Sequence, residues 1–105
     1  MSRVDGTLRK LVEAIRCWDP EAKIILFGSR ARGDYIRESD YDLIVVSSRF
    51  AGVPFIRRAA ILTKEVFKRD VKGRFEFLCY TPEEFERKRR ELGIVSSAVV
   101  EGIEL

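Results

Sequence analysis

Hydrophobic residues occur along the chain with two different spacings. In residues 7–18 and again in residues 53–68, apolar residues recur every three or four positions, with polar residues between them. This spacing predicts two amphipathic helices, each with one face directed at a core. Asp19-Pro20 follows the first segment and ends it, because the residue before a proline is disfavoured in a helix.

A third helix is expected from Thr81. Thr81 is a favourable N-cap, Pro82 suits the first helical position, and Glu84 completes a capping box. Gly93 is predicted as the C-cap of this helix. The last twelve residues, 94–105, fit either a short helix or a final strand, and the pattern does not separate these two structures.

Three short apolar runs predict buried strands. They are "KIILF" (residues 23–27), "YDLIVV" (residues 41–46) and "RFEFLCY" (residues 74–80). The link between the first two strands has about a dozen residues, which is short for a helical crossover and long for a hairpin. We therefore expect an α/β (α+β) fold, in which a small mixed β-sheet carries helices packed mainly on one face.

Composition predicts one cytoplasmic domain. The 105 residues are 46% hydrophobic, which suits a single globular domain spanning residues 1–105. The longest apolar runs are far too short to span a membrane, and the first residues lack the apolar core of a signal peptide. Cys17 and Cys79 are the only cysteines and lie far apart, which argues against a disulfide framework, and no histidine is present to complete a zinc site. We therefore interpret both as small buried hydrophobic residues.

The charged residues carry two further indications. The chain is 35% charged and contains no Asn, Gln or His, a composition typical of hyperthermophilic proteins. Its net charge of +3 is mild; it suits a protein that handles phosphates but does not establish nucleic-acid binding. The basic runs fall on polar helix faces without interleaved aromatic residues, so a nucleic-acid partner is possible but unsupported.

Two aspartates stand at the start of the second predicted strand. Asp40 and Asp42 are two residues apart, so in a strand their side chains would point to the same face. A divalent cation relieves the repulsion between such carboxylates, and Mg²⁺ commonly binds one or two of them together with substrate phosphates. Taken alone, the pair is a weak signal, and an ordinary polar turn in which Ser39 or Asp40 caps local backbone amides explains it better.

A glycine turn follows the first predicted strand. At Gly28-Ser29 the backbone can approach a ligand closely, and the turn amides and the Ser29 hydroxyl can cradle a phosphate. Arg30 and Arg32 add positive charge nearby. By itself this segment also fits a plain turn with solvated arginines. If the two strands are neighbours, however, the anion site and the cation site would face each other, as needed to attack the α-phosphate of a nucleoside triphosphate.

The segment "GSRARGDYIRESDYDLIVV" resembles the signature of nucleotidyltransferases related to DNA polymerase β, and the short chain resembles the minimal members of that superfamily. The resemblance implies two metal ions, most simply Mg²⁺, bound by Asp40 and Asp42. It implies a triphosphate, with ATP favoured, on Gly28 and Ser29, whereas the roles of Arg30 and Arg32 are less defined. It also implies a HEPN-domain protein as partner, with this chain acting as an antitoxin that adenylylates it.

The third carboxylate of the family comes from a later strand. In this sequence Glu76 is the acid at that position, where the family usually has aspartate. The residues leave open whether Glu76 binds metal or is a solvent-facing residue of an edge strand. Two further hypotheses for the whole chain also stay open: a catalytically weak module that binds a nucleotide or partner and acts by occupancy, and a module that binds tRNA or another RNA.

Overall fold

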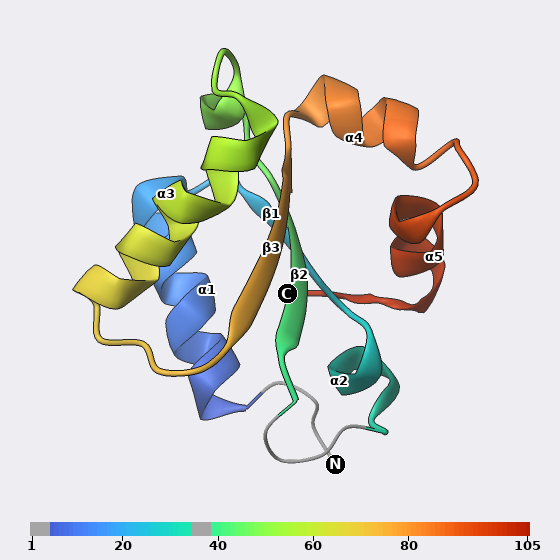
Figure 1. Ribbon diagram of the computed structural model, residues 1–105. Coiled ribbons are helices and arrows are strands. Elements are labelled where there is room, and N and C mark those ends of the chain that lie inside the picture. Colours follow the sequence, from blue (N-terminus) through green and yellow to red (C-terminus); the bar gives the residue numbers. More distant parts are fainter. Residues whose placement is uncertain (1–4, 35–38) are drawn as a thin grey trace.

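A four-stranded mixed sheet forms the centre of the molecule (Figure 1). The computed structural model describes residues 5–34 and 39–105. The strands are β1 (Lys23–Phe27), β2 (Tyr41–Val46), β3 (Phe75–Tyr80) and β4 (Ile103–Glu104), in the spatial order β3-β2-β1-β4. β1 pairs antiparallel with β2 and β4, whereas β2 and β3 are parallel. The expected mixed sheet and its three main strands are confirmed.

The two longest helices pack on one face of this sheet. They are α1 (Gly6–Trp18) and α3 (Phe55–Lys68), whose apolar stripes meet the alternate residues of the strands. Leu43 and Val45 of β2 point to this side, as do Phe77 and Cys79 of β3. The alternate residues of the same strands are buried on the opposite face. Because both faces are covered, the strands read as continuous apolar runs in the sequence.

Two shorter helices cover part of that opposite face. They are α4 (Pro82–Lys88) and α5 (Ile94–Glu101), which bury Ile44 and Val46 of β2 beneath Phe85 and Val95. The larger core therefore lies under α1 and α3, as expected, but the second face also carries a smaller core. None of the helices in the described ranges is both long and apolar enough to cross a membrane.

The predicted end of the third helix was wrong. The helix begins at the Thr81 capping box as expected, but it ends at Lys88 and not near Gly93. The residues beyond Phe85 have no apolar surface to cover, and four consecutive cations from Arg87 to Arg90 repel one another. Gly93 instead precedes α5, where its N–H donates to the Ser96 hydroxyl (3.2 Å). The final residues form both structures that the pattern left open, since β4 follows α5.

A buried ion pair joins α3 to the start of α4. Arg58 is 6% exposed, and its guanidinium donates to both carboxylate oxygens of Glu84. The same guanidinium donates to the carbonyl oxygen of Cys79 (3.2 Å). These contacts lower the pKa of Glu84 to about 2, with the Arg58 hydrogen bond as the largest cause. The pair fixes the end of β3 against α3, since Glu84 also caps α4 through the Thr81 N–H.

Candidate active site

Asp42 occupies the central position of the candidate site. The β1–β2 pairing places Phe27 opposite Asp42, and the β2–β3 pairing places Glu76 opposite Asp42 on its other side. Residues paired in this way point to the same face of a sheet. The side chains of Asp42 and Glu76 therefore share the face that carries α4 and α5, at the end of the sheet away from α4.

Gly28 lies directly against Asp42. It has φ +76° and ψ −157°, and it is the N-cap of the short helix α2 (Ser29–Arg32). A Cβ atom at Gly28 would lie 2.4 Å from Asp42 Oδ2. Both the positive φ and the missing space require glycine here. The antiparallel pairing explains the contact, because it brings the end of β1 to the start of β2.

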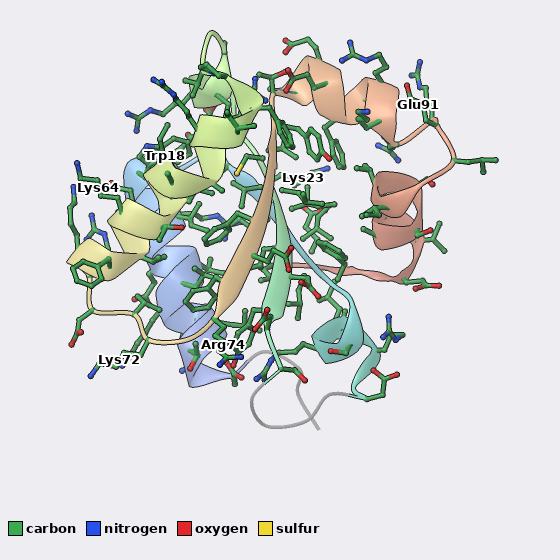
Figure 2. All side chains as sticks on the ribbon, in the orientation of Figure 1. Trp18, Lys23, Lys64, Lys72, Arg74 and Glu91 are labelled. Carbon is green, nitrogen blue, oxygen red and sulfur yellow. The ribbon has the colours of Figure 1, made fainter. Side chains whose placement is uncertain are left out.

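Three carboxylates converge at this end of the sheet. Burial, the charge of Glu76 and a hydrogen bond with it, and the charge of Asp40 raise the pKa of Asp42 above its usual range, in that order of size. Asp42 is half-buried, whereas Asp40 and Glu76 are exposed. Asp40 lies just before β2, with an oxygen 4.0 Å from the guanidinium of Arg74. Arg74, labelled in Figure 2, lies just before β3.

The residues present fit a hard divalent cation. Oxygen ligands suit Mg²⁺, and the like charges around Asp42 are the electrostatic condition that a cation relieves. No three acidic or cysteine side chains in the described residues form a preformed metal cluster. Mg²⁺ does not need one, because it usually keeps waters and completes its shell with substrate phosphates.

Arg30 and Arg32 lie on different sides of α2. Two residues along an α-helix are separated by about 200°, so the two guanidinium groups cannot share a direction. Arg32 is exposed and lies on the Asp42 side, where its charge opposes the rise in the pKa of Asp42. Its Nε donates to Asp34 Oδ2 at 3.2 Å. Of the two predicted phosphate-binding arginines, Arg32 is the one placed near the carboxylates.

Arg30 instead belongs to the packing on the α1 side. It is 7% exposed, and its guanidinium lies 3.8 Å from the centre of the Tyr41 ring. Its Nε donates to the Ser39 carbonyl at 3.0 Å, and Nη1 is 4.0 Å from Asp5 Oδ2. Tyr41 points to the face opposite Asp42, so Arg30 is directed away from the carboxylates. We therefore leave Arg30 out of the proposed triphosphate site.

The contact network of Arg30 was not anticipated from the sequence. Asp5 caps α1 by accepting from the Leu8 N–H (2.8 Å) and also accepts from the Tyr41 hydroxyl (2.7 Å). Through Arg30 and Tyr41 this network joins α1, α2 and the start of β2, the segment that carries Asp40 and Asp42. The polar residue at the helix start was the one available signal, because Asp is a preferred N-cap.

Comparison with known proteins agrees with this architecture. Residues 8–103 match the family model described as "Nucleotidyltransferase domain". The chain therefore belongs to the nucleotidyltransferase domain family.

One named relative and two solved structures are similar to different shares of this chain. A Methanocaldococcus jannaschii protein named "Putative protein adenylyltransferase" is 71% identical over 24 residues, which are 23% of this chain and 24% of that protein. The match thus spans about a quarter of the relative's length. A crystal structure described as a "putative nucleotidyltransferase" is 28% identical, with a TM-score of 0.56 over 82% of this chain and 90% of the other. A second such structure, from Sulfolobus solfataricus, is 22% identical (TM-score 0.60, covering 99% and 86% of the two chains) and supports the fold alone.

Proposed function

We propose that this chain transfers a nucleoside monophosphate, with AMP favoured, from a nucleoside triphosphate to a hydroxyl group. The contact between Gly28 and Asp42 is the observation that carries the proposal, since it joins a phosphate-binding turn to a carboxylate that favours a cation. In the transfer, the acceptor oxygen forms a bond to the α-phosphorus while the bond to the β-phosphate oxygen breaks. Pyrophosphate leaves, and the hydroxyl proton is lost.

Different residues of the chain would hold the triphosphate and the metal. Gly28 and Ser29 would hold the triphosphate, with Arg32 adding positive charge beside it. Asp40, Asp42 and Glu76 would hold Mg²⁺, in one or two ions, which neutralises the phosphate charge and orients the reacting groups. Glu76 is exposed at the sheet edge while Asp42 is half-buried, so an acceptor hydroxyl would enter from the Glu76 side.

A tyrosine of a HEPN-domain partner is the proposed acceptor, which would make this chain an antitoxin. The name of the Methanocaldococcus relative and the resemblance to minimal nucleotidyltransferases support a protein acceptor. The carboxylate site itself has little surface with which to select one, so recognition would come from the partner. Neither cysteine forms a disulfide, but only Cys79 is buried; Cys17 is exposed, so the expectation that both are buried hydrophobes was wrong for Cys17.

Transfer of label tests this function. ATP, GTP, CTP and UTP, each labelled on the α-phosphate, are incubated at elevated temperature with Mg²⁺, the chain and, as candidate acceptor, the product of the neighbouring gene. Label on the partner with wild type, and none with the Asp40→Asn/Asp42→Asn double variant, is the expected result. Tight, metal-independent binding of the partner without any transfer would instead support a module that acts by occupancy.

A further inference from the structure

An open cavity of about 530 Å³ lies beside the carboxylate site, between the end of β1, α2 and α5. Phe27, Gly28 and Arg32 line it on one side, and Ile94, Ser97 and Glu101 line it on the other. Figure 1 shows α2 and α5 on the same side of the sheet. Its volume falls within the range of roughly 300–1,000 Å³ typical of small-molecule sites.

The cavity is continuous with the proposed triphosphate site. Gly28 belongs to both, and Phe27 pairs with Asp42, so their side chains share one face of the sheet. The last turn of α5 is held close to β1: a Cβ atom at Gly102 would lie 2.8 Å from the Leu26 carbonyl oxygen. The backbone at the end of α5 is thereby held beside the end of β1, and Glu101, which precedes Gly102, is exposed there.

The walls of the cavity combine apolar and polar groups. Phe27 and Ile94 offer apolar surface, and Ile94 is 63% exposed although it is a large aliphatic residue. Ser97 contributes a hydroxyl, which can donate and accept, and Glu101 contributes a carboxylate, which only accepts when it is ionised. Arg32 places a cation between this cavity and the carboxylates.

We propose that this cavity binds the nucleoside portion of the triphosphate, with the base on Phe27 and Ile94 and with Ser97 and Glu101 accepting hydrogen bonds from its hydroxyl or amino groups. This arrangement matches the nucleoside part of a nucleoside triphosphate, which has a flat base, several hydrogen-bond donors and, attached at one end, the phosphate chain. The inference rests on the proposed function, because it requires the triphosphate to lie on Gly28 and Ser29. It assigns base and sugar selectivity to α5.

Binding measurements without an acceptor test the assignment. Calorimetry gives dissociation constants for the Mg²⁺ complexes of ATP, GTP, CTP, UTP and inorganic tripolyphosphate. Ser97→Trp fills the cavity from an exposed position, and Val100→Trp is the matched control on the same helix, where Val100 is 84% exposed and lies outside the cavity lining.

We expect Ser97→Trp to weaken the preferred nucleotide at least tenfold while leaving tripolyphosphate binding unchanged, and Val100→Trp to change neither. Unchanged tripolyphosphate binding also shows that the variant is folded. Glu101→Gln keeps the shape of the side chain, and its lost charge should weaken the preferred nucleotide by about tenfold, the size of a hydrogen bond to a charged group.

Two results would overturn the inference in different ways. In the first, Asp42→Asn abolishes tripolyphosphate binding but Ser97→Trp leaves the nucleotide affinities unchanged. The nucleoside then does not bind in this cavity, and the proposed function still stands. Failure of tripolyphosphate and all four nucleotides to bind the wild type would overturn both.

Discussion

Gly28 and Asp42 approach each other so closely that no side chain fits between them. A Cβ atom at Gly28 would lie 2.4 Å from Asp42 Oδ2, and the φ of +76° disfavours any other residue. Gly28→Ala should therefore displace the Asp42 carboxylate. We expect at least a ~100-fold loss of transfer, the usual effect of moving a catalytic group by about 1 Å.

Gly52→Ala provides the control for that substitution. Gly52 has a similar φ of +80°, but a Cβ atom added there would meet nothing within 4 Å. Gly52→Ala should lose about 1–2 kcal/mol of stability from its positive φ. Gly28→Ala should lose more, because its φ and ψ lie in a region that almost only glycine adopts and its Cβ would meet Asp42; only Gly28→Ala should lose activity. Equal activities in transfer assays, with both proteins folded by circular dichroism, would contradict a steric role for Gly28.

Asp42 should destabilise the metal-free protein at neutral pH. Burial and the neighbouring negative charges raise its pKa in the folded state. An acid whose pKa is raised in the folded state destabilises the fold at pH values above that pKa, where it is ionised. The destabilisation disappears at low pH, where the group is protonated in both the folded and the unfolded protein. Asp42→Asn should thus raise the melting temperature by a few degrees at about pH 7 and change it little at about pH 3.

Thermal unfolding without metal measures this effect, and Glu13→Gln, at an exposed carboxylate on α1 far from the site, is the control. Mg²⁺ with tripolyphosphate should stabilise the wild type more than Asp42→Asn. A lower melting temperature for Asp42→Asn at neutral pH would show that the carboxylate stabilises the fold.

The sequence left open whether Glu76 binds metal or is a solvent-facing residue of an edge strand, and its position fits both. It is an exposed residue of an edge strand, and it lies directly opposite Asp42. If it binds metal, Glu76→Gln should reduce transfer by about 10- to 100-fold, in line with the loss of one electrostatic group, without lowering the melting temperature. Glu13→Gln, on the exposed side of α1, should change neither quantity. Full activity in Glu76→Gln would leave Asp40 and Asp42 as the sole protein ligands proposed.

The Arg58–Glu84 pair should give the fold an acid-sensitive contribution. The pKa of Glu84 is lowered from 4.5 to about 2, so its contribution is present above about pH 4.5 and is lost as the pH falls toward 2. Glu84→Gln retains the capping box and removes the ion pair. Because the Glu84 side chain is 30% exposed, we expect a loss of about 2 kcal/mol at neutral pH, the size of a hydrogen bond to a charged group, shrinking below about pH 4.5. Urea unfolding across this range measures it, and a pH-independent difference would contradict the ionic origin.

The strands were predictable because local patterns determine them, and continuous apolar runs indicated β1, β2 and β3. The i, i+2 spacing predicted that Asp40 lies near Asp42, and the charge of Asp40 does raise the pKa of Asp42, although Asp40 lies before β2 and not within it. Metal binding by these residues stays a prediction. The antiparallel pairing then confirmed the expected neighbourhood of Gly28 and Asp42.

Other features depend on contacts between distant segments. The early end of α4 reflects missing apolar partners, and the direction of Arg30 depends on Tyr41 and Asp5. The cavity under α5 arises only when the final strand pairs with β1. The single-domain organisation, the hyperthermophilic origin, the HEPN partner and the cytoplasmic location stay predictions.

The most direct test of the account is a crystal structure with Mn²⁺ and a non-hydrolysable nucleoside triphosphate analogue, using the anomalous signal to locate the metal. We predict Mn²⁺ between the carboxylates of Asp42, Asp40 and Glu76, with the triphosphate on Gly28 and Ser29. Triphosphate on the α1 side beside Arg30, or Mn²⁺ away from Asp42, would contradict it.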